Sequence, residues 1–421
     1  MNHNHAQESF PAFGLSLLFK ILIATLILYP AYSVEANNTY YIRLVLPNIM
    51  IVITLVWYLL FCPRQYAADR TARIFSAVCI VTLILYNTVC YYFNGLYGQW
   101  YWDQVNYSVG ILFFLFLVFC MPGQKIKEMD LLRFILFVTV ISTLCCFFMF
   151  HKYELQSLNI RWDAASLNGQ KEEYGIRCSW LFPHKSQYAL VLLMSIFLVL
   201  RHRRTFTRQW VGWGFFLFLL YGLYICDTMS AFGGLILGLG GMLLDDLKKK
   251  GLLRYKYTFI GGGILAAAGI AVLALIGRQR SLYTLGARIP IWTASIQNIL
   301  ANPAGIGQRF GSHFGMHAMG ELYVDNCHNV FLNHALRFSI PAGILFAVLI
   351  LLIAAYTIYV SRSFFALGSW LGILFLLNMD QTVNPIQFAY FLLLTFFVYL
   401  YKPSDCDASP TIHSSADSND A

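Results

Sequence analysis

The chain has 421 residues, of which 58% are hydrophobic and 12% are charged, and its formal net charge is +9. An ordinary soluble domain has about 25% charged residues, so the composition excludes this class and indicates a polytopic membrane protein. Apolar runs recur along the chain, and a run of about twenty residues can cross a hydrocarbon core about 30 Å thick as a helix.

The order of polar and apolar segments predicts an all-α protein with a single transmembrane domain at residues 13–401. Residues 1–12 are expected to form a cytoplasmic tail. Residues 402–421 are rich in Ser and Asp, so we expect a disordered cytoplasmic tail that cannot bury enough apolar surface to fold. About twelve transmembrane helices are expected, at residues 13–33, 43–62, 74–94, 105–122, 133–151, 186–200, 210–225, 229–246, 257–277, 338–361, 364–378 and 386–401.

Lys and Arg gather in loops that the twelve-span arrangement places on one side of the membrane. Cytoplasmic loops carry an excess of these residues, so we assign this side and both termini to the cytoplasm. The net positive charge is then a signal of topology. We expect no nucleic acid partner, because nucleic acid binding requires a basic face on a soluble domain.

Two outward-facing loops are long, at residues 151–185 and 278–337, and both contain cations that run against the positive-inside bias. Arg177 and Lys185 lie in the first loop, and Arg288 and Arg309 lie in the second. These cations are expected to bind an anion. The alternative, that translocated loops simply tolerate some Lys and Arg, remains open for each residue.

The second loop contains a predicted amphipathic helix, because apolar residues recur at helical spacing from Leu285 to Leu300. Arg288 and Ser295 are expected on its other faces, with the apolar face at the outer membrane surface. The Gly-rich and Pro-containing segment at 302–311 predicts a turn after this helix. His328 and Asn329 are expected to begin a helix that leads into the next span, with a capping side chain or an exposed imidazole.

A metal site would require converging oxygen ligands. The outward acidic residues form no Asp-x-Asp pair, so we expect a mechanism without metal and without a cofactor. Asp227 and Asp380 could line an outward cavity, but we favour the interpretation that they belong to short polar turns.

The segment LGARIPIWTASIQNILANPAGIGQRFG, followed about twenty residues later by CHNVFLNHAL, resembles the signature region of the O-antigen ligase and O-antigen polymerase superfamily. The segment RCSWLFPHKSQYALVL is similar to the family's entry to its sixth span. The resemblance implies a GT-C-like bacterial glycosyltransferase in the cytoplasmic (inner) membrane, with its active site facing outward. The implied donor is a glycan linked to undecaprenyl diphosphate, and the acceptor is a lipid or glycan hydroxyl.

The resemblance also implies roles for individual residues. Arg288 would bind the donor diphosphate, and His328 would activate the acceptor hydroxyl. The transfer would invert the anomeric configuration and would not require a metal ion. The implied substrate-binding residues are Arg177, Lys185, Arg309, Asn329 and Trp292.

The chain departs from the family at the start of the eighth span, where Asp227 to Ala231 contain no arginine. Arg177, Lys185 or Arg309 would have to replace it in space, or the diphosphate would be held differently. An O-antigen or capsular polysaccharide polymerase is the alternative within the family, and a twelve-span transporter or flippase of lipid-linked oligosaccharides is the alternative from another class. Neither the sugar nor the acceptor follows from the sequence.

Overall fold

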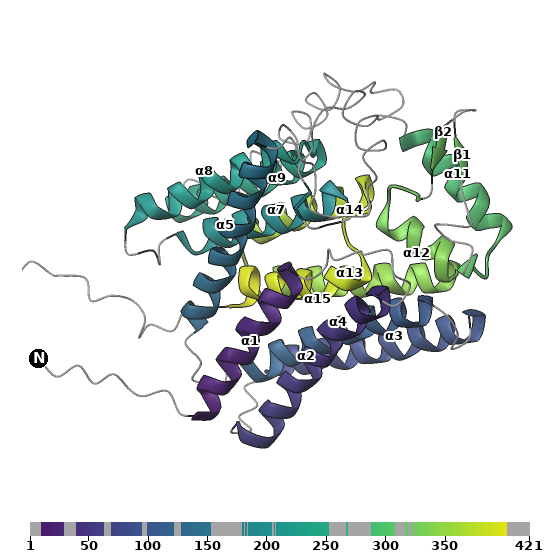
Figure 1. The fold of residues 1–421 in the computed structure, drawn as a ribbon, viewed down its shortest axis with the longest axis horizontal. Helices are drawn as coiled ribbons and strands as arrows, with labels where there is room; N and C mark the ends of the chain where they lie inside the picture. Colours follow the sequence, from purple (N-terminus) through teal and green to yellow (C-terminus); the bar gives the residue numbers. More distant parts are fainter. Residues whose placement is uncertain are drawn as a thin grey trace, which may run out of the picture.

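The computed structural model is helical apart from one short hairpin within the residues that it describes (Figure 1). The structure describes residues 10–28, 39–62, 69–94, 99–121, 128–152, 179–180, 182, 184–203, 206, 208–251, 267, 288–307, 316–318, 322–324 and 326–401. The all-α prediction is confirmed for these residues.

The helices are α1 (Phe10–Leu28), α2 (Thr39–Phe61), α3 (Arg70–Asn94), α4 (Gln99–Cys120), α5 (Glu128–Lys152), α7 (Lys185–Arg201), α8 (Gln209–Ile225), α9 (Met229–Lys249), α11 (Arg288–Ala301), α12 (Val330–Phe338), α13 (Ile340–Ser361), α14 (Phe364–Met379) and α15 (Pro385–Thr395). The π-helix η5 (Phe396–Leu400) continues α15. The strands β1 (Met316–Ala318) and β2 (Leu322–Val324) form an antiparallel hairpin in which His317 is opposite Tyr323.

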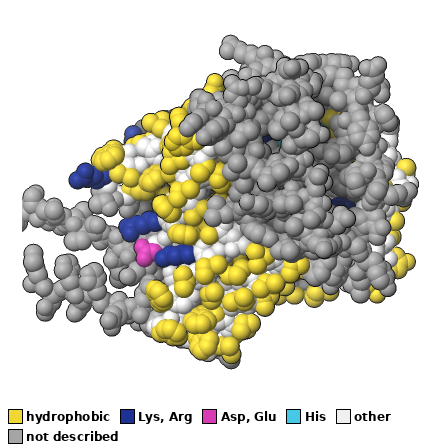
Figure 2. Space-filling model, viewed as in Figure 1, with side chains coloured by type: hydrophobic (Ala, Val, Ile, Leu, Met, Phe, Trp, Pro, Cys, Tyr) yellow, Lys and Arg dark blue, Asp and Glu magenta, His cyan; other side chains and the backbone are white. Residues whose placement is uncertain are grey.

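Six of the described helices are long and apolar enough to cross a membrane, namely α1, α3, α4, α5, α9 and α13. Many large apolar side chains are exposed on the helices, and most of the described surface visible in Figure 2 is hydrophobic. The protein is therefore a membrane protein. The number of twelve spans stays a prediction: described helices occupy eleven of the predicted intervals, and residues 257–277, except 267, lie outside the described part of the chain.

Helix α15 lies at the centre of the bundle. It contacts α1, α2 and α4 on one side and α7 on the other, and Figure 1 shows it between these helices. A helix that is hydrophobic all round is a buried helix, and the sequence FAYFLLLTFFVYL has this composition. Its side chains are buried on every face from Phe388 to Tyr399.

Helices α9 and α14 pack closely along glycines, because small residues let helix backbones approach one another. A Cβ atom added to Gly234 would lie 3.0 Å from the carbonyl oxygen of Gly372, and one added to Gly372 would overlap the backbone of Gly234. At one end of the pair, the carboxylate of Asp245 accepts hydrogen bonds from the backbone N–H groups of Phe364 and Phe365, at 2.8 and 3.0 Å. These contacts make α9 and α14 one rigid unit.

We expect Gly372→Ala to destabilise the protein by about 1–3 kcal/mol, because the added methyl group has no space between the two backbones. Gly214→Ala on α8 is the matched control, since nothing lies within 4 Å of an added Cβ there. This control should instead stabilise the helix by up to about 1 kcal/mol through helix propensity. Apparent Tm values in detergent should move in opposite directions, and shifts of equal sign would contradict the close packing.

The two ends of the bundle differ in chemistry. Arg203, which follows α7, forms an ion pair of 2.9 Å with Asp246 near the end of α9, and Lys248 and Lys249 lie in the last turn of α9. We call this the basic end. Lys and Arg side chains are visible toward the left of Figure 2. The starts of α7 and α9 and the end of α14 lie at the opposite end of the bundle.

The predicted amphipathic helix is confirmed as α11, which begins at Arg288. Its face formed by Ile291, Ser295 and Ile299 is buried, and Ile291 and Ile299 share a small hydrophobic core with Leu336 of α12. The prediction that Ser295 lies on a face other than the apolar one is wrong, because Ser295 is buried beside Ile291 and Ile299, and its hydroxyl donates to the backbone oxygen of Ile291. The exposed apolar residues of α11 are Ile289, Ile296 and Leu300.

The predicted turn after α11 is confirmed over the described residues 302–307. Gly305 and Gly307 have φ values of +85° and +49°, which favour glycine because it lacks a Cβ atom. The turn holds the junction of α12 and α13: the Ile306 N–H donates to the Leu336 oxygen at 2.9 Å, and the Ile340 N–H donates to the Pro303 oxygen at 3.0 Å. Residues 330–361 therefore form two helices, and the break at Ser339 lies within the predicted span 338–361.

Candidate functional site

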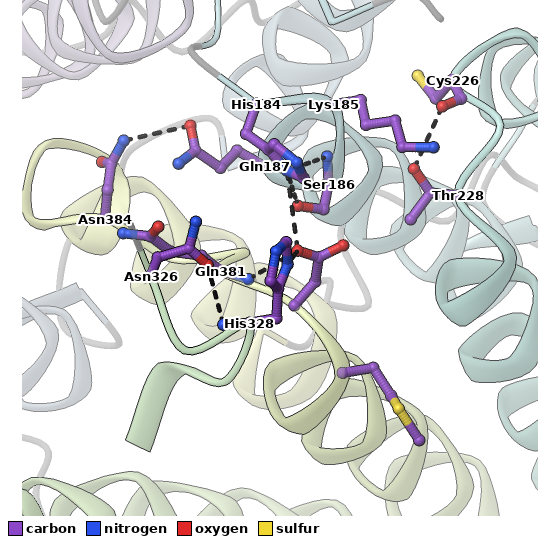
Figure 3. Close-up of polar contacts among 12 residues, drawn as sticks. His184, Lys185, Ser186, Gln187, Cys226, Thr228, Asn326, His328, Gln381 and Asn384 are labelled. Atoms are coloured by element: carbon purple, nitrogen blue, oxygen red, sulfur yellow. Dashed lines mark hydrogen bonds and ion pairs between the residues drawn. The ribbon is translucent and has the colours of Figure 1, made fainter. Parts of the chain in front are cut away.

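Four polar side chains meet at the end of the bundle opposite the basic end: His184, Arg288, His328 and Asp380, which we call the Asp380 cluster. His184 directly precedes α7, Arg288 begins α11, His328 lies two residues before α12, and Asp380 follows α14. Figure 3 shows the side chains of His184 and His328 pointing toward one another, and their ring centres are 6.4 Å apart. Helix termini thus bring together residues that are far apart in the sequence.

Asp380 is at the centre of this cluster, and its side chain is only 5% exposed. Its carboxylate lies 3.2 Å from Nδ1 of His328, 3.5 Å from a terminal guanidinium nitrogen of Arg288 and 3.9 Å from Nδ1 of His184. Burial alone would raise the pKa of Asp380, but His184, His328 and Arg288 outweigh it, so the pKa lies well below its ordinary value. The carboxylate is therefore ionised at neutral pH.

The ionised carboxylate determines the tautomer of His328. An ionised Asp is only an acceptor. Nδ1 of His328 therefore carries the proton and donates a hydrogen bond to Oδ1 of Asp380. The other ring nitrogen, Nε2, then carries a lone pair in the neutral imidazole. An imidazole oriented in this way presents a lone pair that can accept the proton of a hydroxyl group.

The backbone of His328 has a φ value of +46°. This left-handed conformation costs a residue other than glycine about 1–2 kcal/mol, and such strain gathers at functional sites. The side chain of Asn326 supports the conformation by accepting a hydrogen bond from the His328 N–H at 2.9 Å. Asn329 then caps α12 by accepting from the N–H groups of Phe331 and Leu332.

His184 has a different role from His328, because its Nδ1 accepts a hydrogen bond from the Ser186 N–H and caps α7. Burial lowers the pKa of His184, and the charges of His328, Lys185 and Arg288 act in the same direction against the attraction of Asp380. His184 is therefore neutral at neutral pH, with its proton on Nε2.

Lys185 lies next to His184 and reaches the start of α9. Its Nζ atom is 3.4 Å from a carboxylate oxygen of Asp227 and also donates to the Asp227 backbone oxygen. Asp227 has a φ value of +48° and occupies the tight turn between α8 and α9. A cation from the start of α7 therefore lies beside the turn that begins the segment 227–231, which contains no arginine.

The comparisons with known proteins leave the family open. Neither the scan against models of protein families nor the search of curated proteins finds a match. The family resemblance stays a prediction, and the case for a function rests on the site geometry.

The structure brings together several of the predicted site residues. Arg288, His328 and Lys185 lie in or beside the cluster. Asn329 is hydrogen-bonded to α14, because its side-chain N–H donates to Oδ1 of Asn378 at 3.1 Å. Trp292 lies one turn after Arg288 on α11, and its buried indole N–H meets no hydrogen-bond acceptor in the described residues.

The remaining predicted residues, Arg177 and Arg309, lie outside the described residues. The described residues contain no group of three or more His, Cys, Asp or Glu side chains that are placed to hold a metal ion. The absence of metal from the mechanism remains a prediction.

Two residues of the cluster were missed by the sequence analysis. Asp380 was interpreted as part of a polar turn, but the structure makes it the shared partner of three basic side chains. His184 directly precedes Lys185 within the segment that carries the family resemblance, yet it was not singled out. A signal for both was available, since each is an ionisable residue at the boundary of an apolar helix.

Proposed function

We propose that this protein is a membrane glycosyltransferase that transfers a glycan from undecaprenyl diphosphate to an acceptor hydroxyl. The observation that carries this proposal is the orientation of His328 by the ionised carboxylate of Asp380, with Arg288 beside them. A general base next to a guanidinium group suits attack by a hydroxyl and departure of a diphosphate. The resemblance to O-antigen ligases and polymerases supports the same reaction.

The reaction needs one base and one cationic group. The acceptor hydroxyl gives its proton to Nε2 of His328, and its oxygen forms a bond to the anomeric carbon of the donor sugar. The bond from that carbon to the diphosphate breaks, and its electron pair leaves on the diphosphate oxygen. Attack opposite the leaving group inverts the anomeric configuration. Arg288 stabilises the developing negative charge, and Asp380 stabilises the imidazolium.

The fold supports an outward-facing site. Cytoplasmic loops are enriched in Lys and Arg, so we assign the basic end, with Arg203 and Lys248, to the cytoplasm. The Asp380 cluster lies at the other end of α7, α9 and α14 and faces outward. We place the protein in a bacterial cytoplasmic membrane, where a lipid-linked donor reaches the cluster from the outer leaflet.

We assign to Lys185 the role of the arginine that is missing near Ser230. Its ammonium group lies at the start of α9, held by Asp227, and it can contribute positive charge to a diphosphate bound beside Arg288. An ammonium group is a point charge and cannot form the bidentate contact of a guanidinium. Replacement of Lys185 by Arg keeps the positive charge and adds the bidentate geometry, so this substitution is compatible with the proposed role.

The direct test is transfer by the purified protein from a defined glycan linked to undecaprenyl diphosphate, in the presence of EDTA. Lipid A core and a lipid-linked repeat unit are offered as acceptors in separate reactions. Product on the core would establish a ligase, which is the reading we favour, and longer lipid-linked chains would establish a polymerase. Folded protein that forms neither product, but moves lipid-linked glycan across a vesicle membrane, would establish the transporter alternative.

For Arg288→Ala we expect kcat/KM for transfer to fall by about 10²–10³, the loss typical for removal of one group that stabilises developing charge. Arg288→Lys should retain part of the activity, because it keeps the charge and loses the bidentate geometry. Arg203→Ala is the matched control, since it removes an ion-paired arginine at the basic end. Unchanged transfer by well-folded Arg288→Ala would remove the diphosphate role.

A further inference from the structure

Asn329 lies between the two chain segments that carry His328 and Asp380. It follows His328 directly and caps α12, which begins at Val330. Asn378 lies two residues before Asp380, in the last turn of α14. The side-chain N–H of Asn329 donates to Oδ1 of Asn378 at 3.1 Å. This hydrogen bond therefore joins the same two segments as the contact between His328 and Asp380.

The side chain of Asn329 is used by the protein itself. Its Oδ1 accepts from the N–H groups of Phe331 at 2.9 Å and of Leu332 at 3.0 Å, so both lone pairs of this oxygen are occupied. One of the two amide hydrogens binds Asn378, and Asn329 is only 7% exposed. Its oxygen is thus not available to a substrate, in contrast to the role that the family resemblance implies.

Asn378 is held in turn by its own helix. Its Nδ2 donates to the Leu374 oxygen at 2.8 Å, which leaves Oδ1 to accept from Asn329. Helix α14 packs closely against α9 along glycines. The N–H of Asp380 donates to the Leu376 oxygen at 3.2 Å and continues the hydrogen bonding of α14. The acceptor for Asn329 therefore belongs to a rigid part of the bundle.

The start of α12 is the more adjustable partner. This helix has only nine residues. It lies between two residues other than glycine that have positive φ values, His328 at +46° and Ser339 at +148°. Backbone conformations of this kind persist only where the surrounding structure holds them. A contact from outside α12 is therefore needed to fix the position of His328 against α14.

The hydrogen bond between His328 and Asp380 does not supply this precision alone. Nδ1 and Oδ1 are 3.2 Å apart, at the long end of the range of about 2.7–3.2 Å for N–H···O hydrogen bonds. Charge-assisted hydrogen bonds usually shorten to about 2.7–2.9 Å. A small outward shift of α12 would break this bond, so a second contact between the two segments has a direct effect on it.

We propose that Asn329 is a positioning residue: by joining the start of α12 to Asn378, it keeps Nδ1 of His328 within hydrogen-bond distance of Asp380. The effect on catalysis rests on the proposed function, whereas the effect on the proton of His328 rests on these contacts alone. Reacting groups must be held to within about 0.5 Å. Loss of the Asn329 contact should release His328 from a single tautomer and slow the transfer.

The test uses two variants that remove the contact from opposite sides. Asn329→Ser keeps an oxygen that caps α12 about equally well, but its side chain is too short to reach Asn378. Asn378→Ala removes the acceptor and leaves the cap unchanged. Asn87→Ser is the matched control, because the Asn87 amide also joins two helices: its Oδ1 accepts from Nε2 of Gln104 at 2.7 Å, between α3 and α4. All proteins are full-length, in lipid nanodiscs.

The first measurement needs no substrate. Nitrogen NMR of labelled histidine distinguishes the Nδ1–H tautomer from the Nε2–H tautomer, and the His328 signal is assigned by its absence in His328→Gln. At about pH 8, above the ordinary imidazole pKa near 6.5, we expect the Nδ1–H tautomer alone in the wild type and in Asn87→Ser. Asn329→Ser and Asn378→Ala should show a mixture of both tautomers. A single Nδ1–H tautomer in both of these variants would overturn the proposal.

The second measurement is the rate of transfer. In Asn329→Ser and in Asn378→Ala, kcat should fall by about tenfold to a hundredfold, since a misplacement of about 1 Å can cost about 10²-fold. KM for the donor should not change, because Arg288 and Lys185 are intact. The double variant should be no slower than either single variant, because all three lack the same contact. Asn87→Ser should keep the wild-type kcat, even if its Tm falls as far.

The kinetic result also decides between the two roles of Asn329. A higher KM with an unchanged kcat in Asn329→Ser would assign Asn329 to substrate binding and overturn the positioning role. If the tautomer of His328 changes as expected but the wild type transfers glycan to neither acceptor, the positioning role is supported and the proposed function fails. If the wild type transfers glycan and both variants keep its kcat and its tautomer, the positioning role fails and the proposed function stands.

Discussion

Replacement of His328 by Gln is expected to lower kcat for transfer by about 10²–10⁴, because general base catalysis typically contributes this factor. The amide of Gln can still donate a hydrogen bond to Asp380, but it cannot accept the proton of a hydroxyl. Donor binding should be retained, since Arg288 and Lys185 are unchanged. Single-turnover transfer and the Kd of a lipid diphosphate donor, measured on the same preparation, separate these two effects.

The matched control is His202→Gln, which changes a buried histidine at the basic end whose ring nitrogen contacts the Phe397 oxygen. This variant should transfer at nearly the wild-type rate. Loss of donor binding in His328→Gln would contradict the assigned role and would indicate that the imidazole only supports the turn before α12. Normal kcat would exclude His328 as the base.

The second large effect is expected at Asp380. Asp380→Ala should destabilise the protein by about 3–5 kcal/mol, as is typical when one partner of a buried ion pair is removed, because Arg288 would lose its carboxylate partner. Asp380→Asn keeps the shape of the side chain and should fold more readily. It should still lose most transfer activity, since an amide neither stabilises the imidazolium nor requires the proton of His328 to be on Nδ1.

The pH dependence of stability checks the charge of Asp380. Its pKa is lowered in the folded protein, so its stabilising contribution is complete above the ordinary value near 4 and is lost as the pH falls below it. The Tm of the wild type should exceed that of Asp380→Asn throughout the range from pH 6 to 8. A difference that disappears within this range would show that the carboxylate is protonated there.

The helices could be predicted because a long apolar run can be recognised from consecutive residues, without knowledge of tertiary contacts. The interval 229–246, for example, corresponds to α9 at Met229–Lys249. Residues 388–399 are apolar except for Thr395, because this part of α15 and η5 is buried on all sides. The faces of α11 were harder to assign. Ser295 is polar, yet it packs on α12 because its hydroxyl is satisfied by its own helix. A side chain with an internal partner does not need to face water.

The site was predictable in part for a related reason. Arg288 and His328 occur in a recognisable local pattern, whereas the importance of Asp380 depends on contacts with residues that are 52 or more positions away. A lone carboxylate in the segment NMDQTVNP resembles any polar turn. Only the tertiary arrangement, in which α14 ends beside the starts of α7 and α11, shows that this carboxylate is buried between two histidines and an arginine.

The glycine contacts between α9 and α14 also bear on the precision of the site. Helix α14 has 16 residues, so at 1.5 Å per residue it spans about 24 Å between the hydrogen bonds of Asp245 and the carboxylate of Asp380. Because α9 and α14 pack as one rigid unit, Asp380 at the end of α14 and Asp227 before α9 keep a fixed separation. A misplacement of about 1 Å can cost a reaction about 10²-fold, so the close approach of these two backbones helps to hold both ends of the site in register.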